Sequence, residues 1–293
     1  MPTKTSRSTT QKITPDDLLG KANQRFALGL VRAFGGAILF AFPMLMTMEM
    51  WWLGFSISPL RLALFTLFSI PLLVGLSYYA GFEATSTYQL TDDVLDAFTA
   101  YAVGVIAAAV ILLLFAVIGP GMSADEIIGK ISVQAVPASI GALLVRSQFG
   151  ESQRKEEEKR RSAHYGGGLF LMAVGALYLS MSVASTEEMI LISYRMTEWH
   201  IIALALFSLL VMHAFVHAAI VRGKSAILPD TSPVWTVFSR FTAAGYGTAL
   251  LISFYLLWTF GSVDGMSVGQ AIQVTVVLGF PAALGAGVAR QIL

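Results

Sequence analysis

Ionisable side chains in or beside long apolar segments are the residues of this chain that could do chemistry. They are Glu49, Glu187, Glu188, His213 and His217. A carboxylate inside a membrane segment is costly unless it is paired, protonated or in contact with water. Because desolvation favours the protonated form, such a group could carry a proton, and two of them facing one axis could bind a hard cation. The Glu residues therefore predict a proton or cation site.

Contact with water at the headgroup boundary is the alternative for these carboxylates. It is favoured at Glu49 by the adjacent Trp51 and Trp52, because tryptophan is enriched at membrane interfaces. For Glu187 and Glu188, simple exposure of at least one of the pair is the corresponding interpretation.

His213 and His217 are four residues apart, so they share one face of a helix. This spacing suits a transition-metal site or a proton relay, and hydrogen bonding between helices is the alternative. The segment reads His213-Ala214-Phe215-Val216-His217, without the Glu that follows the first His in zinc proteases. The spacing identifies no particular metal, and it argues against a protease.

The segments that carry these residues are long and apolar. The chain is 56% hydrophobic and 13% charged, whereas soluble domains carry about 25% charged residues. Eight spans of about 20 residues are predicted, at roughly 28–50, 60–80, 97–118, 127–146, 166–186, 199–221, 236–260 and 267–290. The fold class is therefore all-α, a polytopic membrane protein. The fourth span is the weakest of the eight, because it contains Lys130, Gln134 and Pro137, and by itself it could be an interfacial helix.

The second half of the chain repeats the first at a nearly constant offset. Phe98-Thr99-Ala100 recurs 143 residues later as Phe241-Thr242-Ala243. At an offset of 144, Gly121-Met122-Ser123 recurs as Gly265-Met266-Ser267, and Pro137, Gly141 and Arg146 recur as Pro281, Gly285 and Arg290. An ordered run of matches indicates an internal duplication. The fourth span gains support from its apolar partner, the eighth.

The duplication divides the chain into a tail (1–25), a first membrane repeat (26–148), a charged linker (149–164) and a second membrane repeat (165–293). Four spans per repeat is an even number, so two parallel four-helix repeats are predicted. At an offset of 139 Glu49 aligns with Glu188, and Gly36 aligns with Gly175. The histidines have no counterpart in the first repeat, which excludes a symmetric histidine cage.

Lys and Arg concentrate in the tail, in the linker and after the sixth span, and few lie in the segments on the other side. The positive-inside rule then places both termini in the cytoplasm. Small-residue runs near Ala138 and Ala282 would allow close packing between repeats or between subunits, so a homo-oligomer is left open.

Several classes of function are excluded or disfavoured by composition. The net charge of +1 argues against nucleic-acid binding. The absence of cysteine excludes disulfides and thiolate metal sites. No Walker A, Rossmann or haem-attachment motif occurs, so we expect no cofactor and no ATP-driven pump.

Met48-Glu49-Met50-Trp51-Trp52 and Ser185-Thr186-Glu187-Glu188-Met189 resemble a family of bacterial integral membrane proteins of unknown function. The resemblance covers most of the chain after the tail. It implies a bacterial inner-membrane protein and supplies neither a substrate nor catalytic residues.

The function predicted from these features is a transporter or channel for a small ion, a cation or a proton, with the lipid bilayer as its surroundings. The carboxylates and the two histidines would be the ion-binding or proton-carrying groups. A structural or sensory membrane protein without transport activity is the main alternative. A lipid-acting membrane enzyme centred on His213 and His217 is a third, and we expect no enzyme, because no further base or ligand set is evident in the sequence.

Overall fold

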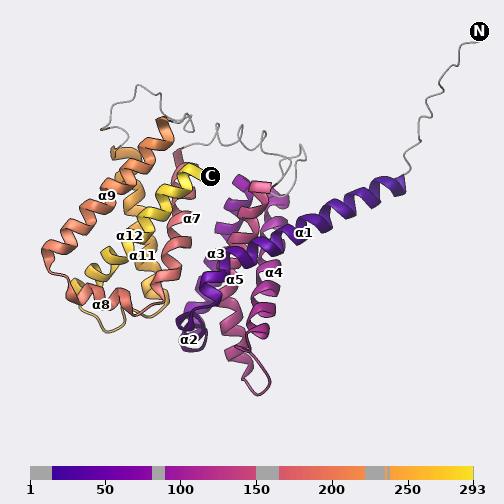
Figure 1. Ribbon diagram of the computed structural model, residues 1–293, viewed down its shortest axis with the longest axis horizontal. Coiled ribbons are helices and arrows are strands. Elements are labelled where there is room, and N and C mark those ends of the chain that lie inside the picture. Colours follow the sequence, from indigo (N-terminus) through magenta and orange to yellow (C-terminus); the bar gives the residue numbers. More distant parts are fainter. Residues whose placement is uncertain (1–14, 81–89, 150–164, 222–234, 236–237, 293) are drawn as a thin grey trace, which may run out of the picture.

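The computed structural model describes residues 15–80, 90–149, 165–221, 235 and 238–292, and their regular structure is entirely helical. The first half contains α1 (Pro15–Leu45), α2 (Met48–Ser56), α3 (Pro59–Ala80), α4 (Leu90–Leu114) and α5 (Ala124–Phe149). The second half contains α7 (Tyr165–Ala184), α8 (Glu188–Arg195), α9 (Glu198–Val221), the π-helix η1 (Phe238–Ala243), α11 (Ala244–Thr259) and α12 (Val268–Ile292). The two halves lie side by side (Figure 1). The all-α prediction is confirmed.

Eight helices of the described residues are long and apolar enough to cross a membrane, as predicted. The uncertain fourth span, Ala124–Val145, is one of them, with a mean hydropathy of 1.6. Of the residues in its apolar segment, 72% are buried inside the protein, which is the largest buried share of the eight spans. It is therefore the central helix of the first half and packs against α1, α2, α3 and α4.

The first and third spans differ from their predicted bounds. The first ends at Leu45 instead of continuing to residue 50, and the third occupies Leu90–Leu114 instead of residues 97–118. A short helix follows the first long helix of each half, α1 and α7. The short helices α2 and α8 lie at the same end of the molecule, which we call the short-helix end (Figure 1). Glu49 and Glu188 consequently occupy the first turns of these short helices and lie outside the spans.

The break after α1 is stabilised by side chains that bind its last carbonyl groups, which have no partner within the helix. The Thr47 hydroxyl donates to the Met44 carbonyl oxygen (2.8 Å), and the Gln134 amide donates to the same oxygen (3.2 Å). The indole nitrogen of Trp51 donates to the Leu45 carbonyl oxygen (2.7 Å). Gln134 comes from α5, so the end of α1 depends on a residue far away in the sequence.

The backbones of α1 and α5 approach closely at a pair of glycines. A Cβ atom on Gly36 would lie 2.7 Å from the Gly141 carbonyl oxygen, and one on Gly141 would lie 2.6 Å from the Gly36 oxygen. Any larger residue at either position would separate the helices. Small residues at such crossings are typical of membrane helix pairs.

The second half contains the same kind of crossing between α7 and α12. A Cβ atom on Gly175 would clash with the Gly285 carbonyl oxygen, and one on Gly285 would clash with the Gly175 oxygen. These positions are the ones that align with Gly36 and Gly141 in the sequence. The division into two parallel repeats stays a prediction, and the matching crossings agree with it.

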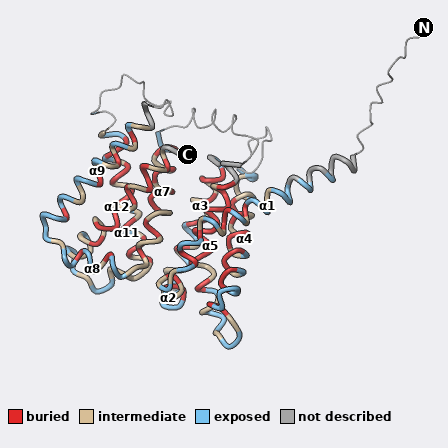
Figure 2. The backbone as a smooth tube through the Cα atoms, viewed as in Figure 1, coloured by how far each residue is buried: buried red, intermediate tan, exposed pale blue. Residues whose placement is uncertain are grey.

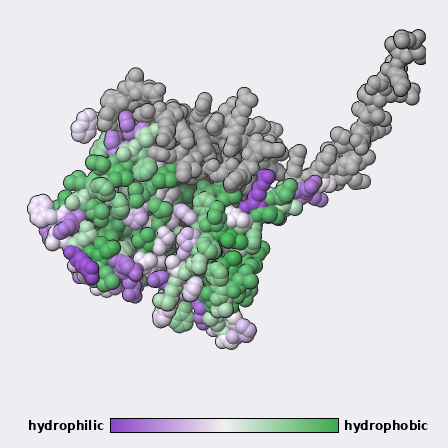
Figure 3. Space-filling model, viewed as in Figure 1, coloured by the Kyte–Doolittle hydropathy of each residue, from purple (hydrophilic) through white to green (hydrophobic). Residues whose placement is uncertain are grey.

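The buried residues lie between the helices of each half, as the red segments of Figure 2 show. One cluster of buried apolar residues extends from the first half into α7, α11 and α12, and a second cluster belongs to the second half alone. Large apolar side chains also cover the outside, among them Leu39, Leu67 and Leu251. Hydrophobic residues dominate the visible surface, and hydrophilic ones gather near α8 (Figure 3), as expected for a lipid-facing surface.

The predicted tail and linker are only partly described. α1 begins at Pro15, inside the segment predicted as a tail, and continues into the first span. Residues 1–14 and the linker residues 150–164 lie outside the described residues.

We predict that Gly36→Ala lowers stability by about 1–3 kcal/mol, because the added methyl group overpacks the α1–α5 crossing. Gly35→Ala is the matched control, since a Cβ atom there meets nothing within 4 Å. Thermal unfolding of the full-length protein in detergent measures both. Equal unfolding temperatures for the two variants would show that the crossing tolerates a side chain.

Candidate functional site

A cavity lies between the two halves of the structure, and the carboxylates predicted to form an ion site do not line it. Glu187 and Glu188 are exposed, and Glu49 is partly exposed. Their helices have different main partners, because α2 packs chiefly against α5 and α8 against α12. The positions of these Glu residues fit contact with water at the short-helix end.

His213 makes a hydrogen bond between helices. Its Nδ1 atom lies 2.9 Å from the Thr242 hydroxyl oxygen of η1. The His217 ring stacks on His213 with 6.2 Å between ring centroids, and Phe238 packs edge-on against His213 at 5.6 Å. His217 itself is exposed. The contact with Thr242 matches the alternative of hydrogen bonding between helices.

The histidines lie far from the short-helix end. His213 follows Glu198, the first residue of α9, by fifteen positions, which corresponds to about 22 Å along the helix axis. In the part of the chain that the structure describes, no group of three or more His, Asp or Glu residues is arranged to hold a metal ion. The five predicted residues are therefore not brought together in one site.

The π-helix η1 is a feature that the sequence did not indicate. Single π-helical turns often occur at functional sites. The Thr242 side chain is buried in this turn, and the Arg290 guanidinium lies 3.9 Å from the centre of the Phe241 ring. The Tyr165 hydroxyl donates to the Arg240 carbonyl oxygen (2.5 Å). η1 thereby links the ends of α7 and α12 to α9.

The first half has its own buried polar group at the short-helix end. The Lys130 ammonium group of α5 binds the Glu126 carboxylate at 2.6 Å and the Val117 carbonyl oxygen at 3.3 Å. Lys130 is only 8% exposed. These contacts join α5 to the chain that follows α4, so the polar residues of the fourth span stabilise the fold.

The two halves meet at a surface that we call the seam, formed chiefly by α3 of the first half with α7 and α11 of the second. Polar contacts lie near its edges. Arg61 of α3 makes two hydrogen bonds to the Asp264 carboxylate, at 2.6 and 2.8 Å, and its guanidinium lies 5.2 Å from the centre of the Trp258 ring. The Tyr178 hydroxyl of α7 donates to the Phe40 carbonyl oxygen of α1 (2.7 Å).

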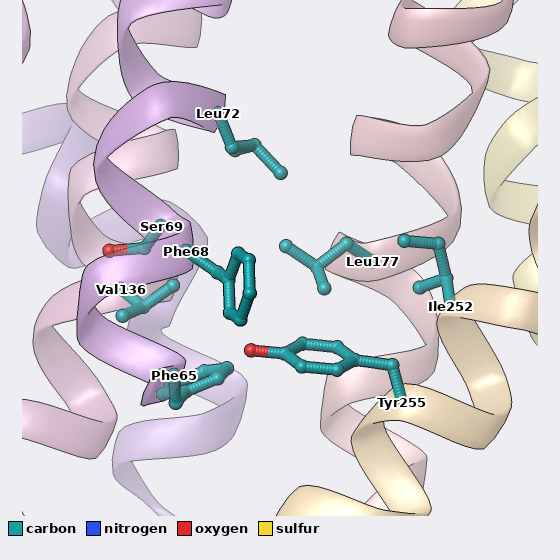
Figure 4. A pocket seen from close by; sticks show the side chains of 8 residues that line it. All are labelled: Phe65, Phe68, Ser69, Leu72, Val136, Leu177, Ile252 and Tyr255. Carbon is teal, nitrogen blue, oxygen red and sulfur yellow. The ribbon is translucent and has the colours of Figure 1, made fainter. Parts of the chain in front are cut away.

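A cavity of about 270 Å³ opens in the seam (Figure 4). Its lining is almost entirely apolar and consists of Phe65, Phe68, Ser69, Leu72, Val136, Leu177, Ile252 and Tyr255. The α3 residues recur at spacings of three and four, so they share one face of that helix. Tyr255 extends from α11 toward Phe65 and Phe68, with its hydroxyl group at the tip (Figure 4).

A comparison with known protein families finds a match. The family match covers residues 29–293, and thus all eight candidate spans apart from the start of the first. The chain belongs to the family described as "Putative integral membrane protein (DUF2391)". The resemblance to membrane proteins of unknown function is therefore confirmed. No curated protein and no solved structure matches the chain.

We predict that Thr242→Val lowers the free energy of unfolding by about 1 kcal/mol, the typical contribution of one hydrogen bond. The control is Thr99→Val, at the aligned position of the first half, where the hydroxyl donates to the Leu95 carbonyl oxygen of its own helix and makes no hydrogen bond to a second helix of the described residues. Chemical unfolding of the full-length protein in detergent measures the difference. Equal losses in both variants would mean that the His213 contact contributes nothing.

The Arg61–Asp264 pair predicts a small pH dependence of stability. Hydrogen bonds from Arg61 hold the pKa of the Asp264 carboxyl below its usual value of 3.8. A lowered carboxyl pKa stabilises the fold above the unfolded value, and the contribution is lost as the pH falls through the folded pKa. Asp264→Asn should therefore lower stability at pH 7 by no more than about 1 kcal/mol, since the pair is partly exposed.

The difference between wild type and Asp264→Asn should shrink as the pH falls below about 4. Thermal unfolding between pH 7 and pH 3 measures it. Glu187→Gln, which removes an exposed carboxylate with no ion pair among the described residues, is the control. A difference that persists unchanged at pH 3 would contradict the assignment to this ion pair.

Proposed function

We propose that this protein is a sensory or structural membrane protein in which polar side chains stabilise contacts between helices. The observation that carries the proposal is the composition of the seam. Its interior is lined by apolar side chains such as Phe65 and Leu177, and its polar groups Arg61 and Tyr178 bind partners in the other half. An ion pathway needs charged groups or carbonyl oxygens along its length.

A sensory role is favoured over a purely structural one by the way the halves are joined. Each half contains a glycine crossing that brings two of its helices into backbone contact. The seam between the halves instead contains a cavity. Occupancy of a cavity between two rigid parts can shift their relative position, which is a common basis of switching.

Transport of a small ion, a cation or a proton, is the second candidate, and it is favoured by one specific observation. His213 faces a π-helix inside the second half and contacts the Thr242 hydroxyl. Ionisable residues inside membrane segments commonly mark proton relays. On this hypothesis the path would run through the second half, and Glu49, Glu187 and Glu188 would take no part in it.

Our proposal includes location and partners. We place the protein in the cytoplasmic membrane of a bacterium with both termini in the cytoplasm, because Lys and Arg concentrate in the segments on that side. We assign it no enzymatic activity. The bilayer is its main partner, and exposed apolar residues on α9 such as Leu206 and Leu210 leave room for a second copy of the chain.

Proton and cation flux into liposomes containing the full-length protein tests the proposal. We expect flux equal to that of protein-free liposomes, and the same low flux for Glu49→Gln, Glu188→Gln and His213→Gln. Flux above this background that disappears in His213→Gln would replace our proposal with the second candidate. His200→Gln is the control, since His200 lies in the first turn of α9 and pairs with Thr197.

A further inference from the structure

The seam cavity has a graded polarity along α3. Arg61, paired with Asp264 and stacked near Trp258, lies one helical turn before Phe65, at the short-helix end. The α3 residues that line the cavity then run from Phe65 to Leu72, about 10 Å along the axis. A charged pair beyond the Phe65 end of an apolar cavity is complementary to an amphiphile whose head group lies near Arg61.

The buried Tyr255 hydroxyl lies at the Phe65 end of this cavity (Figure 4). The Thr259 hydroxyl, one turn further along α11, is the polar group that interacts with it, but the two do not meet the geometry of a full hydrogen bond. A buried polar group without a partner is destabilising and calls for an explanation. Tyr255 directs its hydroxyl toward Phe65 and Phe68 (Figure 4), where a ligand oxygen could accept its hydrogen bond.

The cavity is open toward the surroundings of the helix bundle. Phe68 lines it and is 57% exposed. Phe68 also packs edge-on against Tyr255 with 5.9 Å between ring centroids. Because the outer surface here is apolar, an acyl chain would enter sideways from the lipid, past the Phe68 ring, and its head group would stay outside the cavity on the Arg61 side.

The size and charge of the site select among amphiphiles. A volume of about 270 Å³ lies just below the range of roughly 300–1,000 Å³ for drug-sized ligands, which favours one chain over a ring system. Arg61 already forms two hydrogen bonds with Asp264. A free carboxylate would have to compete with Asp264, whereas a neutral ester carbonyl needs only a hydroxyl donor.

We propose that the seam cavity binds one acyl chain of an ester-linked membrane lipid, and that the Tyr255 hydroxyl donates a hydrogen bond to the ester carbonyl oxygen. The chain would lie between Leu72 and Leu177. This inference supplies a ligand for the proposed sensory role and rests on that role for its consequence. The binding itself is tested separately.

The test is native mass spectrometry of the full-length protein released from detergent, titrated with lauroyl-lysophosphatidylcholine. Dodecylphosphocholine is the matched probe, because it has the same head group and a chain of similar length but no ester carbonyl. We expect one saturable copy of the ester probe. Tyr255→Phe should weaken its binding about five- to tenfold, as for loss of one hydrogen bond, and should leave dodecylphosphocholine binding nearly unchanged.

Two further variants complete the test. Leu72→Phe fills the cavity from a partly exposed position and should weaken both probes. Tyr246→Phe is the matched control, because Tyr246 also has a buried hydroxyl on α11 but does not line the cavity. It should change neither affinity. Thermal unfolding confirms that each variant is folded before binding is measured.

Equal binding of the ester probe by wild type, Tyr255→Phe and Leu72→Phe would overturn the proposal and indicate a detergent-like coating only. Tighter binding of dodecanoic acid than of the lysophospholipid would overturn the choice of an ester. Either failure leaves the liposome flux result untouched, so the lipid site and the proposed function fail independently.

Discussion

The backbone contact between the first and last spans of each half is the constraint on which the rest of the structure depends. In a bilayer, lipid tails are as apolar as leucine side chains, so helices associate through close packing and hydrogen bonds. The pairs Gly36 with Gly141 and Gly175 with Gly285 permit that packing. They make α5 and α12 the central helices, and α3 is left to contact the other half.

The polar groups on the helices that form these glycine contacts differ between the two halves. Lys130 and Gln134 of α5 bind carbonyl oxygens near the short-helix end, whereas the aligned residues of α12 are Val274 and Leu278. The triplet that contains Thr99 lies in a regular helix, and the triplet that contains Thr242 forms a π-helix. The polar contacts therefore differ between the two halves, although both halves share the glycine crossing.

The sequence predicted the eight spans well because their hydropathy is high. It indicated close packing at small residues in aligned positions, but it predicted that packing between repeats or subunits, whereas the glycine pairs pack within each half. It did not predict the break after α1, since Gln134 binds the Met44 carbonyl oxygen across 90 residues. The sequence did not predict the seam cavity either. The lipid-facing and protein-facing sides of α3 are both apolar, so hydrophobic periodicity cannot show which face lines a cavity.

The distribution of charge decides between an ion and a lipid at the seam. An ion that enters an apolar cavity loses its hydration, and Phe65, Leu72 and Leu177 offer nothing to replace it. An acyl chain loses almost nothing when it leaves the bilayer for the same surroundings. Its affinity then depends on shape and on any polar contact that bulk lipid cannot make. The buried Tyr255 hydroxyl would supply such a contact in the proposed site, so one tyrosine oxygen would distinguish a bound lipid from the bilayer around it.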